Sequence, residues 1–554
     1  MKKTTLFFKK PLVKVSLCLL VFVSSCMSKT TEHNPAPHLI RSGNITQLIV
    51  NGQPFLSLAG ELHNSSSSNL EYMKNLWPIL QQLNLNTVLA PVSWELVETV
   101  EGQFDFTLID GLIAQARENK MKLVFLWFGS WKNLVSTYAP GWVKTDPNRF
   151  PLYYNDEGEK YQMLSAHSEE SKQSDARAFA ALMKHIRQID SIEQTVIMMQ
   201  VQNEVGTSFG DRDCSALATK AYKNQVPEKL MSYLQENKTS LIPELRNLWE
   251  ENGSKMNGNW SEIFGDNKAC NEIFMSWYLS GYIGEVIKAG KAEYDIPMFV
   301  NASVGRQTLK LATYPSGGPV PFTMDVWRAA APELDILSPD IYYGDFDYIC
   351  EQYTLSGNPL YIPEARGGES GAINAMKTFC NYNGLGFSPF GIERYQDNSP
   401  ENDFFTQTYK VLDQLSHLIL TKEAKKQMVA ITVDTVQINH TAILGKYKIE
   451  FTHRGREKGC AMVIEINPDE FVVAGRNLSI EFSLNNSRKE DITGIQLAEE
   501  GFFENNQWVS TRRMNGDQIM VNYSFSNCYK EGKSGNGLRF DRSLTIQRVQ
   551  LYHY

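Results

Sequence analysis

The sequence lacks the short motifs of several common catalytic and metal centres. It has no HExxH or GxSxG element, and its eight cysteines form no CxxC pair. Metal-dependent hydrolysis, serine-nucleophile hydrolysis and a cysteine metal site therefore have no support. We expect no cofactor and no metal. Disulfides are permitted outside the cytoplasm, but their pairing cannot be inferred from the spacing.

A surplus of positive charge is also absent. The 54 lysines and arginines are outnumbered by 62 aspartates and glutamates, which leaves a formal net charge of −8. This balance argues against nucleic acid or another polyanion as partner. With 42% hydrophobic and 11% aromatic residues, the composition instead predicts a large globular protein with more than one domain.

The N-terminal apolar run is too short to span a bilayer. A basic stretch, MKKTTLFFKKPLVK, precedes the apolar VSLCLLVFV, and the string VSSC that ends at Cys26 resembles a bacterial lipobox. We therefore predict a lipoprotein signal peptide over residues 1–25, acylation of Cys26 and a polar tether over residues 26–42. The expected location is outside the cytoplasm, on a membrane, either periplasmic or at the outer membrane or cell surface. The alternative is an ordinary signal peptide with an incidental cysteine.

Beyond the tether, short apolar runs alternate with helical patterns. The eight runs are FLSLAGELH, TVLAPVSW, KLVFLWFG, TVIMMQVQNE, IPMFVNAS, LDILSPDIYY, PLYIPEA and GFSPFGIE. Eight strands interleaved with helices predict an α/β fold, a (β/α)8 TIM barrel over residues 43–424, rather than a doubly wound sheet. Residues 206–292 are predicted to be a helical insertion that forms part of the substrate rim, or else a scaffold excursion without ligand contact.

The pattern of apolar and polar residues changes after the predicted barrel. From about Met428 onward, short β-type runs are broken by Gly, Asn and Asp. This pattern predicts an all-β sandwich domain over residues 425–554. Three roles remain open for it: packing against the barrel, contributing a loop to the site, or binding carbohydrate.

Two glutamates end strands of the predicted barrel. Glu204 closes VIMMQVQNE and Glu364 closes NPLYIPE. Most single glutamates are solvated surface residues, but two acids at strand ends that open onto one face of a barrel are better explained by a site. Two carboxylates so placed are the minimal equipment for cleaving a glycosidic bond.

Six segments carry a family resemblance: GQPFLSLAGELHNS, LNTVLAPVSWELVETVEGQFDF, VFLWFGSWKN, YAPGWVKTD, VQNEVG and YIPEARGG. They resemble the bacterial branch of glycoside hydrolase family 35, β-galactosidases of clan A that carry an additional C-terminal β domain. The resemblance implies that Glu204 is the acid/base, that Glu364 is the nucleophile and that Asn203 hydrogen-bonds the sugar 2-hydroxyl. The chain departs from animal and plant members at Pro91, where they carry Tyr, and in FGSWKN, where they carry an acidic residue.

Further candidate residues for substrate binding stand at the ends of other strands. They are Glu61, His63 and Asn64 after the first strand, Trp94 after the second, Trp131 and Asn133 after the third, and Tyr342 after the sixth. Trp131 is expected to stack on a sugar face, although it and Trp94 could equally pack in the core. Glu393, after the eighth strand, is a third acid that could be confused with the pair.

Three functions remain open at this point. The first is a retaining, exo-acting β-galactosidase that releases terminal β-D-galactosyl residues from oligo- or polysaccharides by double displacement. The second is another clan A β-glycosidase, with a different sugar or with endo-action, and the third is a non-catalytic, glycan-binding surface lipoprotein. The expected partners are a carbohydrate and, through the lipid anchor, a membrane. The oligomeric state cannot be inferred.

Overall fold

The computed structural model describes residues 1, 2, 4–6, 34–43, 45–395, 399–486, 492–514, 516–519 and 536–554. Cys26, most of the predicted signal peptide, and the predicted tether up to residue 33 lie outside these ranges. The chain divides into Met1–Asn34 and Pro35–Tyr554, and the second unit is considered below. None of the helices in the described ranges has the length and apolar character that a membrane span requires.

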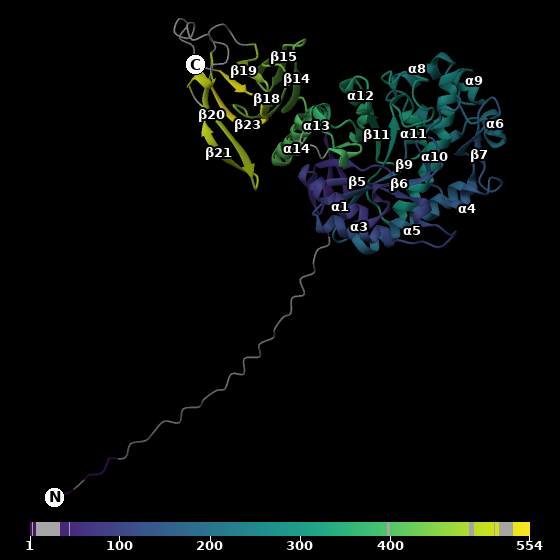
Figure 1. The fold of residues 1–554 in the computed structure, drawn as a ribbon, viewed down its shortest axis with the longest axis horizontal. Helices are drawn as coiled ribbons and strands as arrows, with labels where there is room; N and C mark the ends of the chain where they lie inside the picture. The colour runs from purple at the N-terminus through teal and green to yellow at the C-terminus, as the bar shows by residue number, and fades with distance from the viewer. Residues whose placement is uncertain are drawn as a thin grey trace. The chain divides into compact units, whose positions relative to one another are not determined.

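The eight predicted strands form a closed parallel barrel within the described residues, which confirms the predicted fold (Figure 1). They are β4 (Ser57–Glu61), β5 (Thr87–Ser93), β6 (Lys122–Lys132), β9 (Val196–Asn203), β10 (Met298–Ser303), β11 (Ile336–Ile341), β12 (Tyr361–Ala365) and β13 (Gly386–Pro389). The order around the barrel follows the chain, and β13 closes it against β4. All carboxyl ends of the strands therefore open at one face.

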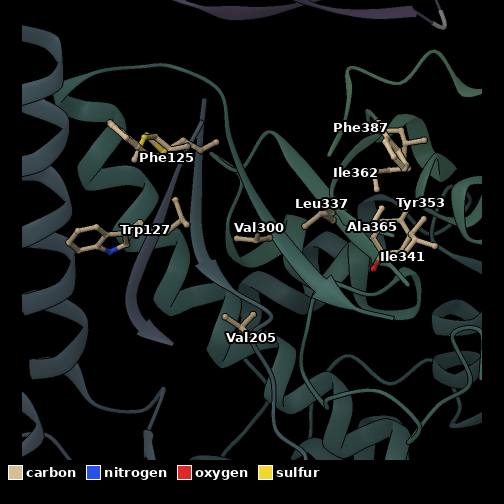
Figure 2. Close-up of a cluster of buried hydrophobic side chains, with 14 of the residues drawn as sticks. Phe125, Trp127, Val205, Val300, Leu337, Ile341, Tyr353, Ile362, Ala365 and Phe387 are labelled. Atoms are coloured by element: carbon tan, nitrogen blue, oxygen red, sulfur yellow. The ribbon is translucent and has the colours of Figure 1, made fainter. Parts of the chain in front are cut away.

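Both faces of the barrel strands are buried, which explains their nearly continuous apolar sequences. On β6, Phe125 and Trp127 face the cluster shared with the surrounding helices, while Val124 and Leu126 face the barrel interior. Figure 2 draws Phe125 and Trp127 together with residues of β10, β11 and β12 that belong to the same extended apolar cluster. A strand that alternates between two apolar layers leaves no exposed face, so polar residues within it stand out as candidates for function.

Helices connect the strands and cover the barrel. They are α1 (Leu70–Gln82), α2 (Trp94–Val97), α3 (Thr107–Glu118), α4 (Gly141–Lys144), α5 (Glu169–Asp190), α11 (Met324–Ala330), α12 (Phe346–Tyr353), α13 (Gly368–Tyr382) and α14 (Pro400–Ile419). Helix α1 illustrates how the sequence forms them. Asn69 caps its first turn by accepting from the backbone N–H groups of Glu71 and Tyr72, and an apolar stripe that includes Met73 and Trp77 is buried.

The segment between β9 and β10, which is described throughout, is helical as predicted. It contains α6 (Ala216–Lys223), α7 (Glu228–Glu236), α8 (Pro243–Glu251), α9 (Trp260–Phe264) and α10 (Lys268–Glu293). Helix α10 packs along α5, and the two approach closely at Gly290, where a Cβ atom would lie 2.3 Å from the Phe179 ring. This contact joins the last helix of the insertion to the barrel wall.

Two small sheets lie outside the barrel strands. A hairpin pairs β7 (Leu152–Tyr154) with β8 (Lys160–Leu164), and a three-stranded sheet contains β1 (His38–Ser42), β2 (Ile45–Val50) and β3 (Gln53–Phe55). Leu48 and Val50 of β2 join the apolar cluster of the barrel interior. The prediction of a tether over residues 26–42 is wrong from His38 onward. These residues form β1, which pairs with β2.

One buried aspartate connects three elements below the mouth of the barrel. Asp175 on α5 accepts hydrogen bonds from Trp127 Nε1 at 2.8 Å, Ser130 Oγ at 2.7 Å and Gln202 Nε2 at 2.7 Å. Burial raises the pKa of this carboxyl, and the hydrogen bonds oppose the rise. The carboxyl ends of β6 and β9 are thereby held in register with each other.

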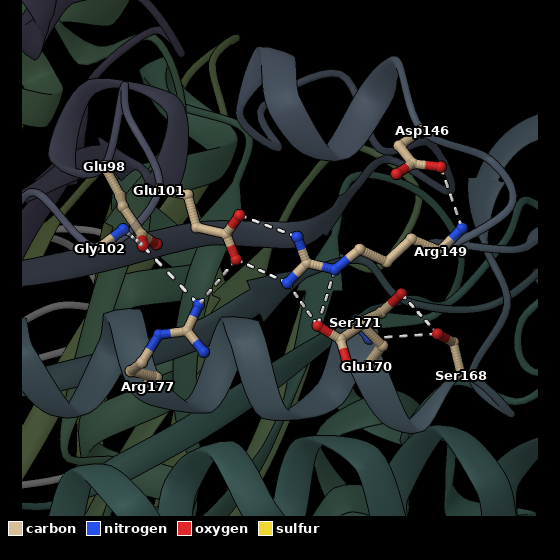
Figure 3. A network of polar contacts seen from close by, with 9 residues as sticks. All are labelled: Glu98, Glu101, Gly102, Asp146, Arg149, Ser168, Glu170, Ser171 and Arg177. Atoms are coloured by element: carbon tan, nitrogen blue, oxygen red, sulfur yellow. Dashed lines mark hydrogen bonds and ion pairs between the residues drawn. The ribbon is translucent and has the colours of Figure 1, made fainter.

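An exposed charge network lies on the outside of the same region (Figure 3). Arg149 binds Glu101 through both terminal nitrogens, at 2.6 and 2.8 Å, and Glu170 through Nε at 2.9 Å. Arg177 lies 3.8 Å from Glu98. Glu98 is buried, but Arg149, Glu101, Glu170 and Arg177 are exposed, so the network joins the loop after α2 to α5 and contributes modestly to stability.

The C-terminal region forms two antiparallel sheets, in agreement with the predicted sandwich. One contains β14 (Met428–Val433), β17 (Gly459–Asn467), β18 (Glu470–Arg476), β20 (Thr493–Glu504), β21 (Gln507–Arg513) and β23 (Thr545–His553), and the other contains β15 (Asn439–Leu444), β16 (Tyr447–His453), β19 (Leu478–Leu484) and β22 (Gly537–Phe540). One apolar cluster includes residues from both sheets. Asn381 of α13 exchanges two hydrogen bonds with the Ala430 backbone, and Arg476 pairs with Glu369 at 2.7 Å. These contacts correspond to the packing role.

Candidate active site

The turn after β9 directs Glu204 into the mouth of the barrel. Gln202 and Glu204 both have positive φ, 65° and 42°, a conformation that is uncommon outside glycine and marks local strain. The Glu204 backbone N–H donates to Asn301 Oδ1 at 3.0 Å, and this bond fixes the turn against β10. The strain is therefore held by a buried polar contact.

Glu364 on β12 is almost fully buried and accepts three hydrogen bonds. Asn203 Nδ2 donates to Oε1 at 2.8 Å, Asn301 Nδ2 donates to the same oxygen at 3.2 Å, and the Tyr342 hydroxyl donates to Oε2 at 2.8 Å. Three donors around one carboxylate stabilise its ionised form. Asn203 and Tyr342, both candidates from the sequence, thus lie beside Glu364.

A third acid, Asp340, completes the group. One carboxylate oxygen from each of Glu204, Asp340 and Glu364 lies within 4.8 Å of the other two. Asp340 and Glu364 are direct partners in the pairing of β11 with β12, and Asn301 Nδ2 donates to Asp340 Oδ2 at 2.8 Å. Oxygens this close could also ligate a divalent cation, but both oxygens of Glu364 already accept from N–H or O–H donors.

The pKa values of these acids diverge because their surroundings differ. Burial raises the pKa of Glu204 to about 7, the charge of Glu364 adds to the rise, and Lys132 opposes it. Burial likewise raises the pKa of Asp340 well above its usual range. At neutral pH a large fraction of Glu204 is therefore protonated, and it lies beside Glu364, whose carboxylate is surrounded by hydrogen-bond donors.

Lys132 is the cation within this group and was not selected from the sequence. It ends β6, is 5% exposed, and its Nζ donates to Asn203 Oδ1 and to Asn133 Oδ1, each at 2.8 Å. Lysine has only donors, so it fixes the amide of Asn203 with the oxygen toward Lys132 and the Nδ2 group toward Glu364. Lys132 thereby orients Asn203 and also lowers the pKa of Glu204.

Glu61 is the most unusual of the other candidates. It ends β4, has no exposed surface, and neither of its carboxyl oxygens has a hydrogen-bond partner among the described residues. Burial and then the charge of Glu364 raise its pKa well above the usual range. An unpartnered buried carboxyl is costly to the fold, which favours a role in binding a ligand.

His63 and Glu393 form a pair at the same end of the barrel. His63 Nδ1 lies 2.8 Å from Glu393 Oε1, which also accepts from the His63 backbone N–H and the Ser66 hydroxyl. Glu393 is thus engaged with His63 and Ser66 rather than placed beside Glu204 and Glu364. Asn64 lies next in the chain, with its Oδ1 buried and without a partner among the described residues.

The two candidate tryptophans are fully buried. Trp131 Nε1 donates to the Leu164 carbonyl at 3.0 Å and the ring packs against Tyr282, with ring centroids 4.5 Å apart. Trp94 Nε1 donates to Glu98 Oε2 at 2.7 Å. Packing accounts for both residues, and neither ring offers an exposed face for the sugar contact expected of Trp131.

Two cavities of about 760 Å³ each are lined by loops that follow barrel strands. His63, Ser66 and Arg394 are among the residues that line one. The other is lined by the loops after β9 and β10, including Ser303, whose hydroxyl bonds to Glu204. Through Ser303, the second cavity adjoins a residue that is bonded to Glu204.

Asn301, Asp340 and Lys132 were missed in the sequence. Asn301 and Asp340 could have been selected, because each is a polar residue inside an apolar strand, in the segments FVNAS and SPDI respectively. No such signal marked Lys132, since a lysine at the end of a strand is usually solvated.

Two family models match parts of this chain. Residues 64–279 match Glyco_hydro_42, described as "Beta-galactosidase", and residues 405–526 match DUF5597, described as a domain of unknown function. The matching family is thus family 42, which corrects the resemblance to family 35. The coarser expectation agrees with this match: residues 64–279 are similar to a β-galactosidase family.

Solved structures with distant similarity include two β-galactosidases. The enzyme of Bacillus circulans sp. alkalophilus is 15% identical over 67% of this chain and 58% of its own, with a TM-score of 0.47. That of the psychrophilic Marinomonas ef1 is 10% identical over 67% and 62%, with the same TM-score. The catalytic domain of the β-amylase of Paenibacillus polymyxa is 12% identical over 64% and 97%, with a TM-score of 0.46. This chain spans about three fifths of the two β-galactosidases. No curated protein matches it.

We predict that Lys132→Met moves the alkaline limb of the pH profile to higher pH. The limb of kcat/KM reports the pKa of the acid in the free enzyme, and loss of a nearby cation raises the pKa of Glu204 above about 7. The expected displacement is roughly one pH unit. The measurement is kcat/KM for an aryl β-galactoside from pH 5 to 10. Lys132→Arg, which keeps the charge, should leave the limb in place, and an unmoved limb in Lys132→Met would contradict this role.

Proposed function

We propose that this chain is a retaining, exo-acting β-galactosidase. The observation that carries the proposal is the pair Glu204 and Glu364, whose carboxylate oxygens approach within 4.8 Å and whose protonation environments differ. Retaining glycosidases hold their two carboxyl groups about 5 to 5.5 Å apart, whereas inverting enzymes leave room for a water molecule between sugar and base. The short approach supports the retaining mechanism.

In the first step, Glu364 attacks the anomeric carbon and Glu204 protonates the departing glycosidic oxygen. Glu204 is suited to this role because burial holds its pKa near 7, so a large fraction carries a proton at neutral pH. Glu364 is suited to attack because its three hydrogen-bond donors fix the orientation of its carboxylate. The bond to the leaving group breaks as the bond to Glu364 forms.

The second step reverses the role of Glu204. Once Glu364 is esterified it no longer carries a negative charge, and the part of the rise in the pKa of Glu204 that comes from that charge disappears. The pKa of Glu204 falls, so its carboxylate takes a proton from water, and the resulting hydroxide displaces Glu364. The same acid thus serves as base without any movement of the backbone.

Asn203 is suited to follow the sugar through both steps. Its Nδ2 group points at Glu364 Oε1, next to which the 2-hydroxyl of a bound sugar would lie. A contact with this hydroxyl strengthens as the oxocarbenium ion develops. Lys132 holds the amide in the required orientation.

The burial of the site supports action on a terminal sugar. Asn203 has no exposed surface and Glu364 is 4% exposed, which favours a pocket for one unit over an open groove. The unpartnered oxygens of Glu61 would accept or donate hydrogen bonds to sugar hydroxyls in that pocket. The substrate would be a terminal β-galactosyl residue of an oligo- or polysaccharide.

We predict distinct effects of the two catalytic substitutions. Glu364→Gln should abolish turnover of every substrate, because no glycosyl ester can form. Glu204→Ala should retain the first step on activated aryl β-galactosides, whose leaving groups need no proton, and azide should restore the second step by giving a β-galactosyl azide. The measurement is product analysis by NMR with and without azide. If azide neither accelerates turnover nor appears in a β-product, Glu204 is not the acid/base.

We predict that Glu61 contributes to the choice of sugar. A site built to hydrogen-bond an axial 4-hydroxyl leaves its own polar atoms unpaired when the epimer binds, so wild type should prefer aryl β-galactoside to β-glucoside. Glu61→Ala should lower kcat/KM for the galactoside by about a hundredfold. Glu61→Gln, which keeps the shape and most hydrogen bonds, should lose less. Comparable wild-type rates on both glycosides, or internal cuts in a polysaccharide, would instead indicate another clan A glycosidase.

We further propose, from the VSSC string, that Cys26 is acylated and anchors the protein to a membrane outside the cytoplasm. Full-length protein should partition into the detergent phase of a Triton X-114 extraction, and Cys26→Ser should move it to the aqueous phase or block processing. The matched control is Cys214→Ser, a half-buried cysteine outside the signal region. Wild-type protein found only in the aqueous phase would overturn the anchor.

A further inference from the structure

A second polar group lies at the mouth of the barrel, outside the catalytic acids. Arg306 follows β10, Tyr343 follows β11 and Arg366 follows β12, so all three belong to loops at the carboxyl end of the barrel. Both guanidinium groups contact the Tyr343 ring, with the Arg366 carbon 4.5 Å and the Arg306 carbon 5.2 Å from its centroid. We call Arg306, Tyr343 and Arg366 the arginine rim.

The arginine rim is exposed and lacks acidic partners. Both arginines are exposed and Tyr343 is 46% exposed. Neither guanidinium forms an ion pair or a hydrogen bond with another side chain in the part of the chain that the structure describes. The neighbouring acids are engaged elsewhere, since Asp211 pairs with Lys268 at 3.3 Å and Asp345 caps α12 through the Tyr348 N–H. Two positive charges are thus held together on one aromatic ring without neutralisation.

The arginine rim adjoins the cavity next to the proposed acid/base. Arg306 and Ser303 both line the 760 Å³ cavity between the loops after β9 and β10, and the Ser303 hydroxyl bonds to Glu204. Because the group that protonates the glycosidic oxygen faces the leaving group, this cavity lies on the leaving-group side. Its volume is within the range that holds a ligand of several rings.

Hydrogen bonds and close backbone contacts fix the two loops that form this cavity. Thr207 and Ser316 exchange backbone hydrogen bonds of 2.9 and 2.8 Å, which join the two loops. Buried Glu272 of α10 accepts from the Gly317 N–H at 2.9 Å. A Cβ atom on Gly305, which has φ of 72°, would lie 2.5 Å from the Thr313 carbonyl oxygen, so the loop requires glycine there. The cavity is consequently a formed feature of the two loops.

Resting on the proposed function, we propose that this cavity and the arginine rim bind the leaving-group part of the substrate, and that this part carries a carboxylate, as a uronic acid does. Guanidinium groups match a planar carboxylate through paired N–H donors, and aromatic faces pack on sugar rings. The net charge of −8 disfavours a polyanion as substrate, so the rim is assigned to one carboxylate next to the scissile bond.

The test compares two galactosyl disaccharides that share one linkage and differ in the second sugar, glucuronate or glucose. Wild type should prefer the glucuronate by about tenfold in kcat/KM at low salt, and the preference should fall as NaCl is raised because the rim is exposed. The double variant Arg306→Gln with Arg366→Gln should reduce the preference to near one. The double variant Arg512→Gln with Arg513→Gln, two exposed residues of β21 with the same change in charge, should keep it.

The outcomes separate this inference from the proposed function. Absence of a preference in wild type, or a preference that survives in the double variant, overturns the assignment of the rim. So does a preference for 6-sulfated glucose with none for glucuronate. Failure to cleave any β-galactoside, aryl substrates included, overturns the proposed function instead. Binding of the glucuronate disaccharide to Glu364→Gln, measured by calorimetry with and without the two arginines, then still tests the rim.

Discussion

The free-energy cost of burying charged groups constrains how the residues at the mouth of this barrel are arranged. Glu61, Asp340 and Glu364 lie there with little or no exposure, Glu204 is partly exposed, and Lys132 is the nearby cation that the pKa shifts identify. Four ionised carboxylates around one ammonium group would be prohibitively unstable. The fold resolves the conflict by raising the pKa of three acids and surrounding Glu364 with donors. The resulting asymmetry is what acid-base chemistry and nucleophilic attack require.

The barrel makes this arrangement possible because it brings distant segments to one face. Strand β9 contributes Glu204 and Asn203, β12 contributes Glu364, and the register of β11 with β12 sets Asp340 beside it. Asp175 holds the ends of β6 and β9 together from the helix layer, so the positions of Lys132 and Asn203 depend on a carboxylate that takes no part in the chemistry. Support behind the site limits the freedom of the side chains that would act on a substrate.

The inner and outer parts of the mouth differ in physical character. The inner acids are buried, so neutral hydroxyls of a sugar are the natural partners for groups such as Glu61. The loops after β10, β11 and β12 are exposed and carry unpaired arginines, so charge can be recognised there without desolvating it completely. A division of this kind lets the chemistry stay constant while the outer loops select the partner sugar.

The local sequence determined much of the fold of this protein. Eight apolar runs with intervening helical patterns specify the barrel because both faces of each strand are buried, and alternating β-type runs specify the C-terminal sheets. Glu204, Asn203, Glu364 and Tyr342 could be identified because polar residues at the ends of apolar strands have few structural explanations. The resemblance pointed to β-galactosidases, as the matching family model does, but to a family other than the one that matches.

Only the tertiary structure decided which of the remaining polar residues meet. Trp131 and Trp94 have sequence contexts like those of site residues, yet packing places them in the core, while Lys132 looks like a solvated strand end and is buried. Asn301 and Asp340 act through contacts with residues far along the chain, which no local pattern encodes. Periodicity determines which way a side chain faces within its own element. The burial of a side chain, the pKa of a carboxyl group and the residues that it contacts depend on elements that closure of the barrel brings together.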